Sequence, residues 1–264
     1  MKTIETYLPR NKWGTKDFRD IKTKLFYSVQ EKQKDFHPLL AATYKDNPIQ
    51  LIDFFSGAGG TSLGFASVNS VIPAFKMLGG CDINAVSAQT YSHNYDTPLV
   101  NEDIRSLAHD SQKLHELLDR IGYDPQKPTI LIGCAPCQGF SSHRKKHWNE
   151  EEDVRNSLVI AFAEIVEQIK PDAIIMENVP EFLSKRYWHY FSAAKSRFEE
   201  IGYTVKQNIY NAAMFGVPQE RFRSIVIAMK KEFLMPVGIL EPFEYKTVRE
   251  AIGDLPPVPA GVAY

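Results

Sequence analysis

From residue 50 onward, short apolar runs alternate with longer stretches in which apolar residues recur at helical spacing. The apolar runs have the length of buried strands, and helical patterns lie between them. The predicted strands cover residues 50–55, 74–82, 97–104, 128–133 and 172–179. The first predicted helix begins at Thr61, and three further helices cover residues 83–95, 109–122 and 156–170. This alternation predicts an α/β fold of βαβ units, with a mostly parallel sheet and helices on both faces.

The pattern changes at both ends of the chain. Residues 203–210 and 223–229 alternate without a helix between them, which predicts an antiparallel strand pair near the C-terminus. Residues 1–49 are polar and relatively basic, and we interpret them as an N-terminal extension. Residues 233–264 are rich in Pro and Gly after one short helix and read as a linker tail. The predicted catalytic domain is therefore residues 50–232.

Composition narrows the class of protein. The chain has 264 residues, a formal net charge of −1 and three cysteines, too few for a disulfide framework. The first residues lack the apolar segment of a signal peptide, and no apolar run approaches the length of a membrane span. We expect a soluble, cytoplasmic protein without a membrane segment. The absence of an overall basic charge does not exclude nucleic-acid binding, because a local stripe of basic residues is enough to bind phosphates.

The candidate chemistry lies where predicted strands end, because ligands of open parallel sheets bind beyond the carboxyl ends of the strands. The first strand is followed by the glycine-rich stretch "SGAGG", which suits either a plain tight turn or a close approach to a ligand. Phe55 precedes it, Asp82 follows the second strand, and Asp103 and Ile104 end the third. Each acid alone is typical of a helix N-cap, but together they indicate an adenosine-containing cofactor.

The fourth strand runs into "GCAPCQGFSS", residues 133–142, with a C-x-x-C spacing. A zinc site would need four ligands, and the third cysteine, Cys81, is the only other one in the chain. A redox pair would open a helix at once, whereas a long polar loop follows here. The remaining interpretation is that Cys137 is a solvent-facing nucleophile and Cys134 a small packed neighbour, with no metal.

The fifth strand ends at "ENVPEF", which places Glu177 beside the Cys137 loop, since consecutive strands are usually neighbours. Glu177 is a candidate acid. The alternative is a buried cap for Asn178 and the next turn.

Four segments in this order, "DFFSGAGG", "APCQGFS", "MENVPEF" and "NAAMFGVPQERFR", resemble the cytosine-5 DNA methyltransferase family over about residues 50–230. The resemblance implies a Rossmann-like methyltransferase fold and S-adenosyl-L-methionine as cofactor. It implies methyl transfer to C5 of a cytosine that is flipped out of double-stranded DNA. The family includes methyltransferases of restriction–modification systems.

By this resemblance Cys137 attacks C6 of cytosine and forms a covalent adduct, while Glu177 supplies a proton to N3. Arg221 and Arg223 brace the flipped base and its phosphate. The candidate cofactor residues are Phe55, Gly57, Ala58, Gly59, Gly60, Asp82, Ile83, Asp103, Ile104, Pro136, Ser157 and Leu158. The candidate DNA contacts are Gln138, Ser141, Arg144, Lys145, Lys146, Asn178 and Gln219.

The chain departs from the family's pattern after about residue 230. The family's target-recognition region and its later "GNSV"-like segment are not found in these 264 residues. We expect a second protein chain to supply them, as in split enzymes, with a truncated product as the alternative. DNA target specificity is then expected to lie outside this chain. The alternative functions are a tRNA cytosine-5 methyltransferase and an inactive module that binds the cofactor or a partner.

Overall fold

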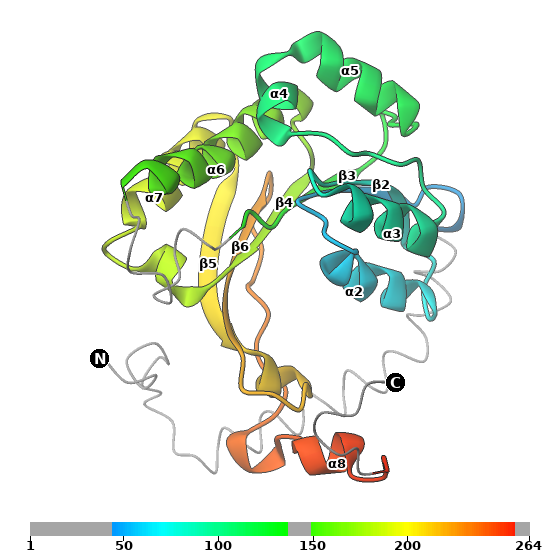
Figure 1. The fold of residues 1–264 in the computed structure, drawn as a ribbon, viewed down its shortest axis with the longest axis vertical. Helices are drawn as coiled ribbons and strands as arrows, with labels where there is room; N and C mark the ends of the chain where they lie inside the picture. The colour runs from blue at the N-terminus through cyan, green and yellow to red at the C-terminus, as the bar shows by residue number, and fades with distance from the viewer. Residues whose placement is uncertain (1–43, 137–148, 257–264) are drawn as a thin grey trace.

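A computed structural model describes residues 44–136 and 149–256, with residues 149–156 described by their backbone alone. Its centre is a six-stranded sheet in the order β2-β1-β3-β4-β6-β5 (Figure 1). The strands are β1 (Ile49–Phe54), β2 (Phe75–Cys81), β3 (Thr129–Gly133), β4 (Ala173–Asn178), β5 (Thr204–Asn211) and β6 (Phe222–Met229). The first four are parallel, and β6 pairs antiparallel with both β4 and β5. The predicted parallel sheet and its antiparallel pair near the C-terminus are confirmed.

Helices cover both faces of the sheet (Figure 1). They are α2 (Gly60–Asn69), α3 (Ala85–Tyr95), α4 (Ile104–His109), α5 (Ser111–Arg120), α6 (Asn149–Ile169) and α7 (Trp188–Glu200). Successive side chains of β1 point to opposite faces of the sheet. Ile52 and Phe54 join the apolar core made with α4 to α7, whereas Asp53 contacts α2 on the other face. No helix in the described part of the chain is both long and apolar enough to cross a membrane.

The predicted strand over residues 97–104 is wrong. Only a single parallel bridge, between Cys81 and Val100, forms there. Pro98 has no N–H to give to a ladder, and α4 already begins at Ile104. The helix predicted over residues 109–122 is the shorter α5, which starts after Asp110, whose carboxylate caps it by accepting from the Lys113 N–H.

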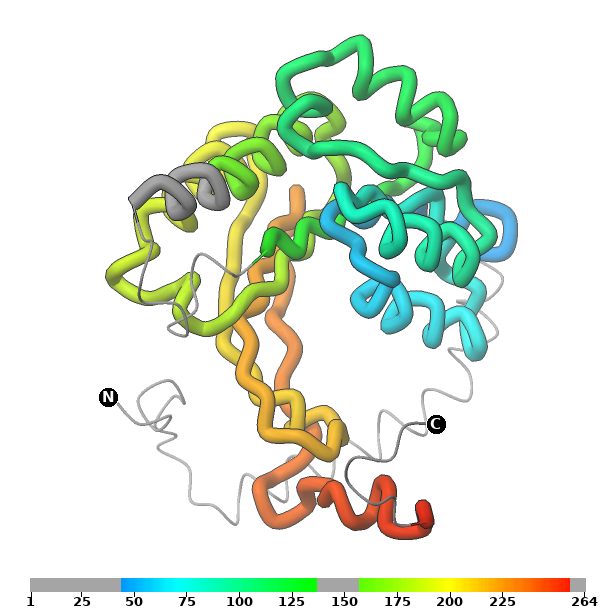
Figure 2. The backbone as a smooth tube through the Cα atoms, viewed as in Figure 1, coloured from blue at the N-terminus to red at the C-terminus, as the bar shows by residue number. Residues whose placement is uncertain are grey.

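The C-terminal part of the described chain folds back along the β5–β6 hairpin (Figure 2). Lys206 of β5 donates to the carbonyl oxygen of Phe233, and the Tyr210 hydroxyl donates to that of Pro236, both at 2.5 Å. The 3-10 helix η5 (Pro242–Glu244) and helix α8 (Val248–Ile252) follow. Helix α8 is the short helix predicted before the Pro-rich end.

Candidate functional site

The glycine-rich loop joins β1 to α2 at the carboxyl edge of the sheet. Gly57 and Gly59 have φ angles of 54° and 95°, in the left-handed region that favours glycine. The Gly57 N–H donates to Asp82 at 2.8 Å, and the Tyr95 hydroxyl donates to the Gly59 carbonyl at 2.5 Å. A Cβ at Gly59 would lie 2.2 Å from the Tyr95 ring. Position 59 therefore excludes every side chain, and the tight loop leaves space next to Gly57, where a Cβ would meet nothing within 4 Å.

Two features of this loop suit a bound ligand. Helix α2 begins at Gly60 without a side-chain cap hydrogen bond and without an acid in its first turn, so its first N–H groups are open to an acceptor. Ala58 is exposed, and Phe55 is half-buried with φ 60°, an unusual angle for an aromatic residue. Such backbone strain costs about 1–3 kcal/mol and concentrates at functional sites.

A buried polar group lies beneath the loop. Asp53 is 1% exposed and accepts a hydrogen bond from Ser62 at 2.7 Å, and the Ser62 hydroxyl also contacts that of Tyr91 at 2.9 Å. The other carboxylate oxygen of Asp53 has no partner among the described residues. Burial raises the pKa of Asp53 to about 7. The sequence reasoning missed this residue, although an acid inside the apolar run "QLIDFF" was a signal for it.

Asp82 and Asp103, the two acids predicted to contact an adenosine, have different surroundings. Asp82 follows β2 and accepts from the Gly57 and Asn84 N–H groups, and the neighbouring Ile83 is 68% exposed. Asp103 is the N-cap of α4, and its ion pair with Arg105, at 2.6 Å, lowers the pKa of its carboxyl. Ile104 is only 4% exposed and belongs to the core. This burial is a correction to the prediction that Ile104 forms part of the cofactor surface.

The loop after β3 is described as far as Pro136, which is exposed. The Cys134 sulfur lies 3.5 Å from the Thr61 hydroxyl, and burial raises the pKa of its thiol to about 12. Cys134 is thus a neutral thiol near neutral pH, in keeping with a packed neighbour. The predicted nucleophile and five candidate DNA contacts lie outside the described residues: Cys137, Gln138, Ser141, Arg144, Lys145 and Lys146.

Glu177 and Arg223 meet at the end of β4. The Nε atom of Arg223 lies 2.6 Å from Oε1 of Glu177, and both side chains are about one-quarter to one-third exposed. They come from adjacent antiparallel strands, in which Glu177 pairs with Ile225. Arg221 is exposed just before β6, and its backbone N–H donates to the Asn211 side chain at 3.1 Å. Gln219 is also exposed. The structure therefore brings the predicted acid and one predicted arginine into direct contact.

Asn178 is 4% exposed and holds two backbone segments together. Its amide nitrogen donates to the Ala135 carbonyl at 3.1 Å, and its amide oxygen accepts from the Val179 N–H at 2.9 Å. Since the side chain is buried and both of its polar atoms are engaged, it does not face a DNA cleft. This is a correction to the prediction of a DNA contact, and it makes Asn178 a support for the loop that leads to Cys137.

Ser157 and Leu158 lie on α6, where Ser157 is exposed and Leu158 packs against the core. They belong to the first helix that the structure describes after Pro136. The structure thus gathers the candidate residues from α6 and from the ends of β1 to β4 along one edge of the sheet.

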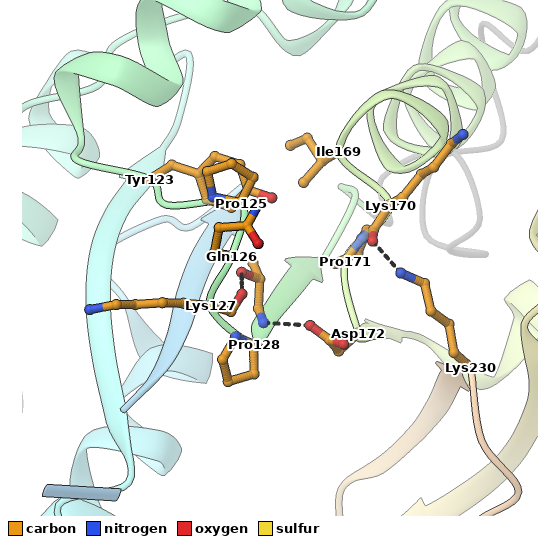
Figure 3. Close-up of a pocket in the computed structure, with 11 residues that line it drawn as sticks. Tyr123, Pro125, Gln126, Lys127, Pro128, Ile169, Lys170, Pro171, Asp172 and Lys230 are labelled. Atoms are coloured by element: carbon orange, nitrogen blue, oxygen red, sulfur yellow. Dashed lines mark hydrogen bonds between the residues drawn. The ribbon is translucent and has the colours of Figure 1, made fainter. Parts of the chain in front are cut away.

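A hollow of about 340 Å³ lies at the opposite, amino edge of the sheet (Figure 3). Thr129 and Asp172 are linked across it at 2.9 Å, and Lys230 donates to the Lys170 carbonyl at 2.6 Å. The side chains of Lys127 and Lys170 point away from it (Figure 3). It therefore presents no converging set of charges and lies apart from the candidate site.

Comparison with known proteins matches this arrangement to one family. The family model for C-5 cytosine-specific DNA methylases covers residues 49–259. The Type II methyltransferase M1.HphI of Haemophilus parahaemolyticus is 36% identical over 215 residues, which are 80% of this chain and 54% of that protein. The Type II methylase M.HgiDII of Herpetosiphon aurantiacus is 31% identical over 206 residues, which are 78% of this chain and 54% of that protein. The chain spans about half the length of the curated relatives it matches.

A solved structure agrees with the fold. It is described as that of a DNA modification methyltransferase encoded within a prophage of E. coli. The TM-score is 0.62 at 25% identity, and the match covers 80% of this chain and 56% of that one.

Proposed function

The chain belongs to the family of C-5 cytosine-specific DNA methylases, and from this premise we propose that it transfers a methyl group from S-adenosyl-L-methionine to C5 of cytosine in DNA. The observation that carries the proposal is the Glu177–Arg223 pair at the carboxyl edge of the sheet. On one side it adjoins the strand that leads to Cys137, because β3 and β4 are hydrogen-bonded neighbours.

The residues around the glycine-rich loop fit an adenosine cofactor with a charged methionine end. The open N–H groups at the start of α2 suit its carboxylate, and the backbone at Gly57 leaves room for close approach. Asp82, with Ile83 exposed beside it, suits the ribose and one face of the adenine. When bound, the cofactor supplies an electrophilic methyl group. The other residues proposed to hold it are Phe55, Ala58, Gly59, Gly60, Asp103, Pro136, Ser157 and Leu158.

The proposed reaction uses Cys137 and Glu177 on the cytosine ring. The Cys137 thiolate forms a bond to C6 while Glu177 gives a proton to N3, so that the displaced ring electrons make C5 nucleophilic. After C5 has taken the methyl group, a base removes its proton, the C5=C6 bond re-forms and the thiolate leaves. The N3 proton returns to Glu177. Over the whole reaction the C5 proton is replaced by the methyl group, the sulfonium of the cofactor would become a neutral thioether, and Cys137 and Glu177 return to their starting states.

Arg223 has a positioning role in this scheme. Its Nε atom lies 2.6 Å from Oε1 of Glu177 and orients the carboxyl group, which leaves the other oxygen to carry the proton for N3. Asn178 in turn ties the Ala135 carbonyl to the end of β4, which sets the path of the chain two residues before Cys137. The proposal of a second protein chain that completes the recognition of DNA stays a prediction.

The test uses the full-length protein, the labelled cofactor and duplex DNA that contains 5-fluorocytosine. Fluorine cannot leave as a proton does, so the reaction should stop at a covalent protein–DNA adduct that survives denaturing electrophoresis. Cys137→Ser should lose both the adduct and methyl transfer to ordinary DNA while it retains cofactor binding.

The matched control is Cys134→Ala, which should keep most of the activity because that thiol is neutral and packed. Equal loss in both variants would contradict the assignment of a single nucleophile. Transfer to tRNA but not to duplex DNA would instead support the RNA substrate.

A further inference from the structure

An exposed basic and aromatic segment enters helix α7, and nothing in the proposed reaction uses it. The α7 entry segment, residues 185–190, reads Lys-Arg-Tyr-Trp-His-Tyr. Lys185, Arg186 and His189 are exposed, and Trp188 is 44% exposed although it is a large apolar side chain. Tryptophan is enriched at interfaces, and here its exposed ring lies in the same short segment as two exposed cations.

The aromatic rings of the segment are held in place. Trp188 packs edge-on against the buried Phe191, with ring centroids 5.1 Å apart. The rings of His189 and Tyr190 lie 3.8 Å apart, and the Arg186 guanidinium lies 5.2 Å over the ring of Tyr187. The segment is therefore a preorganised platform of rings and cations rather than a loose turn.

The position of the segment follows from the topology. Helices α6 and α7 follow the parallel neighbours β3 and β4, so both begin at the carboxyl edge of the sheet. Late in α7, Arg197 pairs with Glu164 and Glu167 late in α6, at 3.3 and 3.2 Å, which shows that the two helices run side by side in the same direction.

The start of α7 thus lies next to the first part of α6. The 3-10 helix η3 (Pro180–Leu183) connects Glu177 to the segment. It also lies against the start of β6, where the Ser224 hydroxyl donates to the Val179 carbonyl at 3.0 Å.

We propose that the α7 entry segment is a second contact surface for the nucleic-acid backbone, with Lys185 and Arg186 on phosphates and Trp188 against an adjoining sugar or unstacked base. The proposal rests on the proposed function and extends it. Cations neutralise phosphates, and exposed aromatic rings stack on bases without regard to sequence. Such contacts fix the register of the DNA and do not read its sequence. A partner protein is the competing occupant.

The experiment measures the affinity of the full-length protein for a labelled mixed-sequence duplex by fluorescence anisotropy between 50 and 200 mM salt, a range of about fourfold in ionic strength. Lys185→Ala/Arg186→Ala should reduce the slope of log affinity against log salt by about 2, because each lost phosphate contact accounts for about 1. Trp188→Ala should weaken binding about tenfold with little change of slope.

The matched control is Lys76→Ala/Lys127→Ala, which removes two positive charges from the amino edge of the sheet. Its slope of log affinity against log salt should equal that of the parent within experimental error. Equal thermal melting of all variants shows that they are folded.

Three outcomes have distinct meanings. If the parent binds DNA and the Lys185/Arg186 variant has the slope of the control, the inference is wrong and a protein partner is favoured. If the variant shows the reduced slope but Cys137→Ser still transfers methyl groups, the surface stands and the proposed reaction fails. If the parent does not bind DNA at all, both are overturned.

Discussion

At the scale of single residues, Glu177 gives the most direct test of the proposed reaction. It is partly exposed at the end of β4, and its carboxylate has Arg223 at 2.6 Å. Glu177→Gln keeps the shape of the side chain but removes the proton donor, so we expect the rate of methyl transfer to fall about 10²–10⁴-fold. Single-turnover transfer of labelled methyl to duplex DNA measures it.

The control for that change is Glu181→Gln, an exposed acid four residues along the chain in η3, which should react like the parent protein. Turnover close to the parent's in Glu177→Gln would remove Glu177 from the acid role. A role for Glu177 could be proposed from the sequence because its motif is local. Its pairing with Arg223 could not, because it depends on β6 lying next to β4.

Asp53 gives the stability of the protein a pH dependence. Its pKa is about 7 in the folded protein and 3.8 in an unfolded chain, because burial disfavours the charged form. Below about pH 4 both states hold the proton, and the contribution of Asp53 to stability is fully present. As pH rises toward 7 the unfolded state loses its proton first, so stability falls, by at most about 4 kcal/mol at 1.36 kcal/mol per pKa unit.

Asp53→Asn should remove this part of the pH dependence, since the amide can keep a contact with Ser62 and does not ionise. Urea unfolding of the parent and the variant at pH 5 and pH 8 measures this pH dependence. Between pH 5 and pH 8 the free energy of unfolding should fall less for the variant than for the parent. Identical falls would show that Asp53 ionises as readily in the folded protein as in the unfolded chain.

At the scale of elements, the loop from β1 to α2 tolerates little change at Gly59. Gly59→Ala would combine an unfavourable φ of 95° with a clash against the Tyr95 ring at 2.2 Å. We expect a loss of about 1–3 kcal/mol in the free energy of unfolding and weaker cofactor binding.

Gly64→Ala in helix α2, which follows this loop, is the matched control, because a Cβ there meets nothing within 4 Å and its φ is not positive. It should stabilise the protein by up to about 1 kcal/mol. Denaturant titration of both variants gives the comparison, and a shift in the same direction for both would contradict the role given to the loop.

The elements themselves were largely predictable. Strands β1, β3 and β4 were expected within about one residue of their observed ends, because their apolar runs are bounded by Gly, Pro or polar residues. Helix α7 was not expected, although Phe191, Ala194 and Phe198 recur at helical spacing and are buried. The insertion of β6 between β4 and β5 could not be predicted, because that order is set by long-range pairing rather than by local pattern.

For the molecule as a whole, the parallel course of β1 to β4 has a consequence for charge. It places the starts of α2, α6 and α7 at one edge of the sheet. Helices α2 and α7 have no side-chain cap hydrogen bond and no acid in the first turn, whereas the sequence of α6 opens with four acids, residues 150–153. The starts of α2 and α7 each carry about half a positive charge from aligned peptide dipoles. A chain with a net charge of only −1 is therefore electrically polar. The starts of α2 and α7 are two fixed positive poles, which favour an anionic group at the edge of the sheet that holds the candidate site even where no cationic side chain reaches it.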